Sequence, residues 1–66
     1  MKNCLKVERA IKNVTQEELA KIIGVSRQAI NSIELGKYVP SSILALKLSR
    51  FFNKSVNEIF TLEEND

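Results

Sequence analysis

The chain has 66 residues, one cysteine and no histidine, so we expect one small domain with neither a disulfide nor a His/Cys metal site. A chain of this size buries only about 60% of the surface that it exposes when unfolded, which favours self-association as a further source of stability. No apolar run approaches the roughly 20 residues of a membrane-spanning helix, and the N-terminus lacks the apolar stretch of a signal peptide. A content of 44% hydrophobic and 27% charged residues is typical of a folded, soluble, cytoplasmic protein.

Charge is distributed unevenly along the chain. The net charge is +2, but Glu63, Glu64 and Asp66 hold three of the eight acidic side chains, which leaves residues 1–62 with ten basic and five acidic ones. A basic body with an acidic tail is typical of a domain that binds a polyanion, although inert small domains share the pattern. We therefore divide the chain into a domain of residues 1–62 and an acidic tail of residues 63–66 that should fray.

Helix formers, caps and breakers predict five short helices and no sheet. The chain shows no sustained alternation of polar and apolar residues, and it contains only two glycines and one proline. Thr15 and Glu18 match the capping box T-x-x-E, as do Ser55 and Glu58, and Gly24 is typical of the position just past a helix end. The expected helices are residues 4–12 capped by Asn3, 16–23, 27–35, 42–52 capped by Ser41 or Ser42, and 56–60. The predicted fold class is all-α.

The segment from Gln16 to Leu35 is the most informative part of the chain. Two helices of about eight residues are joined by Gly24-Val25-Ser26, a turn whose length sets two helices nearly perpendicular. Ala20 lies one turn before the glycine, where a small side chain lets the next helix approach. The apolar positions expected to hold the two helices together are Leu19, Ile23, Val25, Ile30 and Ile33. This spacing predicts a DNA-binding helix-turn-helix.

The face left polar on the second of these helices consists of Arg27, Gln28, Asn31 and Ser32. Arginine suits guanine O6 and N7, glutamine and asparagine suit adenine N6 and N7, and serine suits either base. The solvated face of an ordinary amphipathic helix has a similar composition. The prediction of base contacts therefore depends on the whole helix-turn-helix spacing and not on these four residues alone.

The string TQEELAKIIGVSRQAINSIELGKYVPSS resembles the helix-turn-helix of the phage repressor and Cro family, also called xenobiotic-response-element-type regulators. The resemblance covers essentially the whole chain and is closest to short single-domain regulators. It implies a compact five-helix domain like that of lambda repressor, which binds operator DNA as a dimer and usually represses transcription. The implied partners are double-stranded DNA, read by the third helix in the major groove, and a second copy of the chain. No cofactor, metal, small-molecule ligand or membrane is implied.

The resemblance also assigns roles residue by residue. The positions that match base-reading residues are Arg27, Gln28, Asn31 and Ser32. The positions that match phosphate contacts are Gln16, Ser26, Lys37 and Tyr38. Arg9 and Glu34 match an ion pair that joins the first helix to the third and serves the scaffold. The chain departs from the family pattern at Val7, Ile11 and Ile43, where the family usually has polar residues, and at Ser42 and Ser49, which should thin the core around the fourth helix.

The C-terminal part of the chain carries more apolar side chains than a small core is expected to cover. Exposed together, they form a patch of the kind that marks an association site. We predict a symmetric homodimer through the fifth helix and the end of the fourth, with an interface of Val56, Ile59, Phe60 and Leu62. The competing interpretation is that these residues close the bottom of a monomeric core.

Three functions fit the sequence, and none of them is catalytic, because no nucleophile, base and orienting group can be assembled. The first is a transcriptional repressor that binds an inverted-repeat operator as a homodimer. The second is a DNA-binding antitoxin or controller of a two-gene system, which also binds a partner protein. The third is a protein-interaction module that has lost DNA binding, and the polar side chains of Arg27, Gln28 and Asn31 argue against it.

Overall fold

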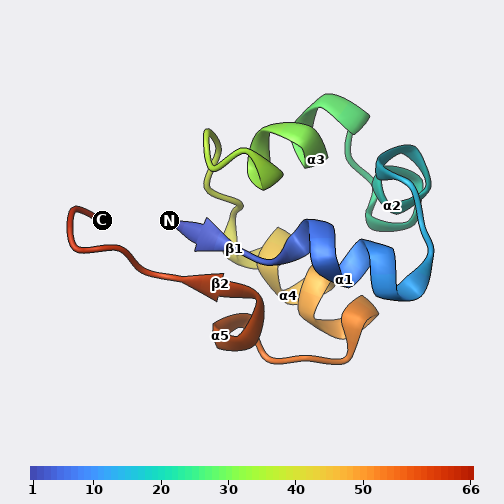
Figure 1. Cartoon of the computed structure of the whole chain (residues 1–66). Coiled ribbons are helices and arrows are strands. Elements are labelled where there is room, and N and C mark those ends of the chain that lie inside the picture. Colours follow the sequence, from blue (N-terminus) through green and yellow to red (C-terminus); the bar gives the residue numbers. More distant parts are fainter.

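Five short helices and one pair of two-residue strands make up the fold (Figure 1). A computed structural model describes residues 1–66. In chain order the elements are β1 (Lys2–Asn3), α1 (Leu5–Lys12), α2 (Gln16–Ile23), α3 (Arg27–Glu34), α4 (Ser42–Phe52), α5 (Val56–Ile59) and β2 (Phe60–Thr61). The prediction of five helices is confirmed. None of them combines the length and the apolar character that crossing a bilayer requires.

Local capping interactions set the turn between α2 and α3. The Thr15 hydroxyl accepts from the Glu18 amide at 3.0 Å, and the Glu18 carboxylate accepts from the Thr15 amide at 2.9 Å, which completes the predicted capping box. Gly24 ends α2 in the left-handed conformation, with φ at 91°, where residues with a side chain are strained. The Ser26 hydroxyl then accepts from the Ala29 amide at 3.1 Å and starts α3. These bonds all lie within a few residues of one another.

The start of α1 differs from the prediction. Cys4 is the N-cap residue, and Asn3 lies one position earlier in β1. The Asn3 side chain still supports the helix, because its oxygen accepts from the Leu5 amide at 3.1 Å. Its amide nitrogen donates to the Ile33 carbonyl at 2.8 Å, near the end of α3. Asn3 therefore joins the N-terminus to α3 rather than capping α1 from the N-cap position.

The two strands were not expected from the sequence. They pair antiparallel, and the register sets Lys2 opposite Thr61 and Asn3 opposite Phe60. The acidic tail continues from this pair and does not run free: the Met1 ammonium lies 3.0 Å from a Glu63 carboxylate oxygen and 3.1 Å from one of Asp66. Both chain ends accordingly lie on the same side of the molecule (Figure 1). Whether the tail frays stays a prediction, although two of its carboxylates contact the Met1 ammonium.

One apolar core joins all five helices. It consists of Leu5, Leu19, Ala20, Ile23, Ile30, Ile33, Leu44, Leu48, Phe52, Ile59 and Phe60. Ile59 and Phe60, which were predicted at a dimer interface, are only 1% and 5% exposed. That part of the interface prediction is wrong, because both side chains are buried inside a single chain. The competing interpretation, a closed monomeric core, holds for these two residues.

Two polar contacts involve Lys54, just beyond the end of α4. Glu8 is buried in α1, and its carboxylate accepts from the Lys54 ammonium at 2.9 Å. This bond raises the pKa of the Lys54 ammonium. Ser49 was expected only to thin the core, but its hydroxyl donates to the Lys54 carbonyl just beyond the end of α4. A small polar side chain is thus accommodated at this position by a hydrogen bond to backbone.

Candidate nucleic-acid interface

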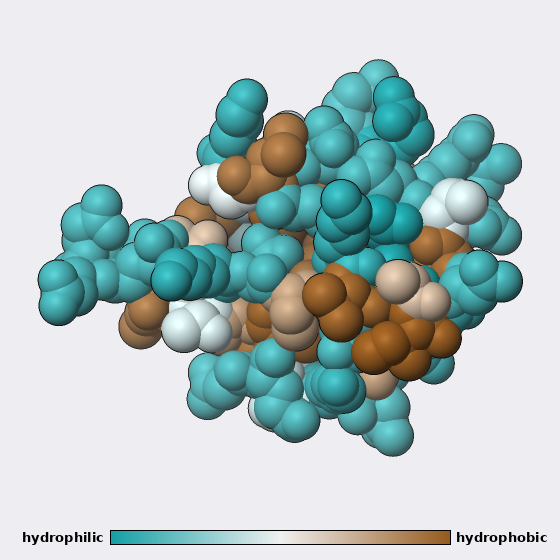
Figure 2. All heavy atoms as spheres, viewed as in Figure 1, coloured by the Kyte–Doolittle hydropathy of each residue, from teal (hydrophilic) through white to brown (hydrophobic).

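Helix α3 has one buried face and one exposed polar face. Ile30 and Ile33 belong to the core, whereas Arg27, Gln28 and Asn31 are exposed. The division follows from the helical period, because residues three and four apart share a face. The outer surface over α2 and the start of α3 is largely hydrophilic, and hydrophobic atoms gather instead over α1 (Figure 2). Three of the four predicted base-reading residues therefore lie together on an accessible surface.

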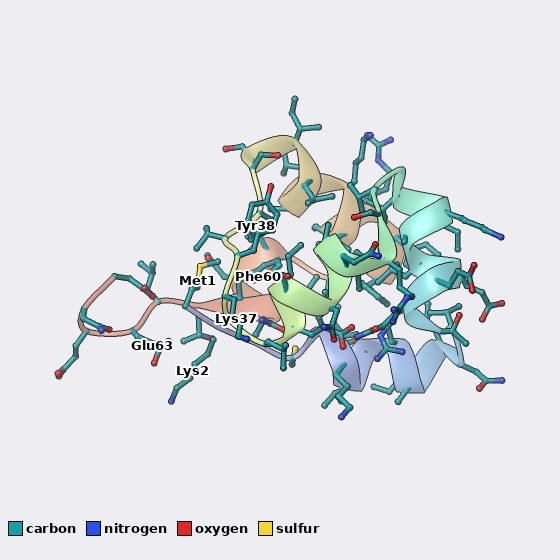
Figure 3. All side chains as sticks on the ribbon, turned by 90° about the horizontal axis from the view of Figure 1, so that it is seen from above. Met1, Lys2, Lys37, Tyr38, Phe60 and Glu63 are labelled. Atoms are coloured by element: carbon teal, nitrogen blue, oxygen red, sulfur yellow. The ribbon has the colours of Figure 1, made fainter.

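Ser32, the fourth of these residues, is positioned differently. It is half-buried, and its carbonyl accepts from the Lys37 amide at 2.9 Å and from the Tyr38 amide at 3.3 Å. These bonds fold the chain back after Gly36, whose φ is 75°. The loop thus keeps the exposed side chains of Lys37 and Tyr38 next to the end of α3 (Figure 3). The Ser32 backbone carbonyl therefore holds this loop, while its half-buried side chain lies at the edge of the polar face.

Ser26 and Lys37 lie at opposite ends of α3, one as the N-cap residue and the other just after the helix. The Ser26 hydroxyl accepts the capping bond from Ala29 and keeps its own hydrogen as a donor. Lys37 has an exposed ammonium group after the helix. Both residues have donors suited to a phosphate, so the structure is compatible with the roles that the family resemblance assigns to them.

Gln16 has a different environment from the one that the sequence suggested. Its side-chain nitrogen donates to the Asn31 oxygen at 3.1 Å and to a Glu34 carboxylate oxygen at 3.0 Å. Both amide hydrogens are therefore used inside the protein, and the side chain has no donor left for a phosphate in this conformation. A direct phosphate contact from Gln16 needs either its backbone amide, at the start of α2, or a rearranged side chain.

Arg9 and Glu34 form a two-point ion pair between α1 and α3. The Arg9 Nε lies 2.6 Å from one carboxylate oxygen, and Nη2 lies 3.1 Å from the other. The Arg9 Nη1 also donates to the Val14 carbonyl at 3.1 Å. The hydrogen bonds to Glu34 raise the pKa of Arg9, and the negative charge of Glu34 adds to the effect. The Glu34 side chain is only 6% exposed, so the pair belongs to the scaffold beneath the polar face.

A polar hollow of about 550 Å³ adjoins the start of α3. It is lined by Arg9, Ala10, Asn13, Val14, Thr15, Gln16, Glu17 and Arg27. The first amides of a helix favour an anion, and the start of α2 opens into this hollow. The carboxylate of Glu17, which lines the hollow, opposes that tendency in part. The neighbouring Glu18 carboxylate is engaged by hydrogen bonding to Thr15, the bond from the Thr15 backbone amide foremost, and this lowers its pKa.

A second, apolar groove of about 380 Å³ lies away from α3. Its lining is Met1, Val39, Pro40, Ser42, Ala45, Leu46, Val56 and Phe60. Met1 and Phe60 lie close together beneath the loop that carries Tyr38 (Figure 3). Of the predicted interface residues, Val56 and the largely buried Phe60 line this groove, and Leu62, two residues after Phe60, is 78% exposed. Sequence reasoning counted Leu46 among the surplus apolar side chains without assigning it to the interface. It missed Val39, although an apolar residue directly before a proline in a loop was a usable signal.

Three comparisons with known proteins agree with this geometry. A model of the helix-turn-helix family matches residues 5–59. An uncharacterized HTH-type transcriptional regulator of Methanocaldococcus jannaschii is 53% identical over 66 residues, which span the whole of both chains. The ImmF control region 10 kDa protein of Bacillus phage phi105 is 34% identical over 65 residues, covering 91% of this chain and 72% of that protein. The crystal structure of the restriction-modification controller protein C.AhdI from Aeromonas hydrophila is 30% identical and covers 85% of each chain, with a TM-score of 0.76.

The fold and these comparisons define the class of the protein as a small helix-turn-helix transcription regulator that binds DNA. More particularly, the chain belongs to the helix-turn-helix family, since the family model spans most of its length. The resemblance to phage repressors and Cro that the sequence motifs indicated is thereby confirmed.

Proposed function

We propose that this chain is a transcriptional repressor that binds an inverted-repeat operator as a homodimer in the cytoplasm, with α3 of each protomer in a major groove. The observation that carries the proposal is the exposed polar face of α3, formed by Arg27, Gln28 and Asn31 over a buried apolar face. These side chains are the types that recognise base edges, and they lie in the N-terminal half of the helix, where recognition helices meet bases.

Hydrogen-bond donors at both ends of α3, placed to meet the DNA backbone, support the same docking. Ser26 precedes the helix, and Lys37 and Tyr38 follow it, so donors flank the base-reading residues on two sides. Contacts of this kind fix the register of a protein on the duplex without reading its sequence. The excess of basic side chains in residues 1–62 adds a general attraction to the phosphate backbone.

Dimerisation is proposed from the surface that the core leaves uncovered. Ile43, Leu46 and Leu62 are each more than 60% exposed, and Val56 lines the neighbouring apolar groove. Two copies that cover these side chains reduce their contact with water. A two-fold axis also places two recognition helices about 34 Å apart, in successive major grooves of a palindrome. We therefore retain Val56 and Leu62 in the proposed interface and replace Ile59 and Phe60 by Ile43 and Leu46.

Footprinting on the promoter of the chain's own gene tests DNA binding. We expect protection of a short inverted repeat, with log affinity falling against log salt concentration by about 0.9 for each neutralised phosphate. Binding that does not depend on salt, or no protection of any promoter site, contradicts the proposal. Sedimentation at micromolar concentration tests the dimer, and a species that stays monomeric on its operator rules it out. A promoter-reporter assay tests repression, since an activator raises the signal and a repressor lowers it.

The second candidate function is a controller or antitoxin in a two-gene system. The observation in its favour is the similarity to the restriction-modification controller protein C.AhdI. The neighbouring gene separates the two candidates: a modification enzyme, nuclease or toxin beside this gene favours the controller, and an unrelated neighbour favours the repressor.

A further inference from the structure

Four polar side chains from three helices form a continuous series of hydrogen bonds. The series begins beneath the polar face of α3 and ends on that face. Arg9 of α1 donates twice to Glu34 of α3, at 2.6 and 3.1 Å. Gln16 at the start of α2 donates to Glu34 at 3.0 Å and to Asn31 at 3.1 Å. This series of hydrogen bonds begins at the nearly buried Arg9–Glu34 ion pair and ends at Asn31, which is exposed on the proposed DNA-binding face.

The charge of Glu34 determines which group donates and which accepts in each hydrogen bond of this series. An ionised carboxylate only accepts hydrogen bonds, so the Gln16 amide must turn its NH₂ group, and not its oxygen, toward Glu34. The second hydrogen of the same NH₂ group is donated to Asn31. The acceptor must be the Asn31 side-chain oxygen, because two NH₂ groups facing each other would repel. The Asn31 oxygen is thereby held toward Gln16, and the Asn31 NH₂ group is left on the other side of the amide.

We infer that Gln16 is a positioning residue that fixes the orientation of the Asn31 amide, so that Asn31 offers N–H donors to the DNA and reads a hydrogen-bond acceptor. This inference rests on the proposed DNA-binding function and deepens it. The acceptors in the major groove are purine N7, guanine O6 and thymine O4, whereas cytosine offers only its N4 amino donor. Cytosine opposite Asn31 is therefore the most strongly rejected base. The bidentate contact to adenine that asparagine often makes is weakened, because the oxygen is already engaged.

A phosphate contact from Gln16, which the family resemblance implies, predicts a different outcome. Losing a phosphate contact weakens binding to every sequence by about the same factor. Losing a positioning residue frees the Asn31 amide to turn over, so that its oxygen can accept from cytosine or adenine. The two roles therefore differ in whether base preference changes at one position or at none.

The test measures binding of four proteins to a set of operators in which each base pair is changed in turn. The proteins are the wild type, Gln16→Ala, Asn31→Ala and the double variant. Asn31→Ala identifies the base pair that this residue reads. At that pair we expect Gln16→Ala to reduce discrimination against cytosine by roughly threefold to tenfold, within the usual range of pairwise coupling. The double variant should discriminate no less than Asn31→Ala alone.

A control variant and a measurement without DNA complete the experiment. Asn57→Ala changes an exposed amide on α5 and should leave every base preference unaltered. NMR relaxation of the free protein should show the Asn31 side-chain amide ordered in the wild type and more mobile in Gln16→Ala, while the helical circular dichroism is retained.

Two results overturn the inference. One is an equal loss of affinity on all operators for Gln16→Ala, which assigns Gln16 a phosphate contact only. The other is independent, multiplicative effects of the two substitutions together with unaltered order of the Asn31 amide. A wild type that binds no operator overturns the proposed function instead, and the NMR measurement still decides whether Gln16 orients Asn31.

Discussion

The strongest stability prediction concerns Glu34→Ala. The Glu34 carboxylate accepts two hydrogen bonds from Arg9 and one from Gln16, and its side chain is almost completely buried. Removing it leaves the Arg9 guanidinium largely shielded from water, with the Val14 carbonyl as its remaining protein partner. Breaking a fully buried pair from one side costs about 3–5 kcal/mol, and because this pair is partly exposed we expect the lower end, about 3 kcal/mol. The total stability of a 66-residue domain is on the order of 3–10 kcal/mol, so this loss is a large fraction of it.

Thermal unfolding followed by circular dichroism measures the effect. A loss of about 3 kcal/mol in a domain of this size lowers Tm by roughly 12–24 °C. Glu64→Ala is the matched control, because it removes an exposed carboxylate from the tail and should change stability by less than about 0.5 kcal/mol. The double variant Arg9→Ala with Glu34→Ala should be less destabilised than the sum of the single variants, since it leaves no unpaired charge.

A Glu34→Ala protein that melts within a few degrees of the wild type refutes this reasoning. That result means that water reaches Arg9 in solution and that the pair adds nothing to the core. Equal effects of Glu34→Ala and Glu64→Ala lead to the same conclusion.

Three further predictions follow from the other sites. Gln28→Ala should cost about 1–3 kcal/mol of binding free energy at the cognate operator and relax the base preference at one base pair. Lys37→Ala should weaken binding to all sequences alike and reduce the slope of log affinity against log salt concentration by about one. Binding measured at several salt concentrations checks both variants, and identical effects of the two on specific and random DNA contradict the assignment. Leu62→Asp should weaken dimerisation in sedimentation runs and keep the helical signal, whereas Ile59→Asp should unfold the chain because its side chain is buried. Hydrogen bonds to the two tail carboxylates raise the pKa of the Met1 ammonium above its usual 8.0, so its contribution to stability is complete below pH 8.0 and is lost as the pH rises through the raised value. The protection of the β1 and β2 amides, measured as their exchange rate relative to the intrinsic rate at each pH, should fall there, and unchanged protection argues against the contact.

Local patterns in the sequence were enough to place the helices and the exposed polar face of α3. The capping box at Thr15 and Glu18, the left-handed Gly24 and the hydroxyl cap at Ser26 all act within three or four residues, so their effects can be read along the chain. The exposed polar face of α3 follows from the helical period in the same way. The Arg9–Glu34 contact spans 25 residues and became visible in the sequence only through resemblance to a family.

The sequence by itself determined the all-α class, the helix-turn-helix and the exposed polar face of α3, because these depend on short-range hydrogen bonds and on periodicity. Only the tertiary structure decided the contacts between distant segments. The pairing of β1 with β2, the contact of the Met1 ammonium with the tail and the burial of Ile59 all join the two ends of the chain. The bond from Gln16 to Asn31 likewise depends on how α2 and α3 pack. No local pattern encodes such contacts, since their strength depends on partners and on exclusion of water that exist only once the chain has folded.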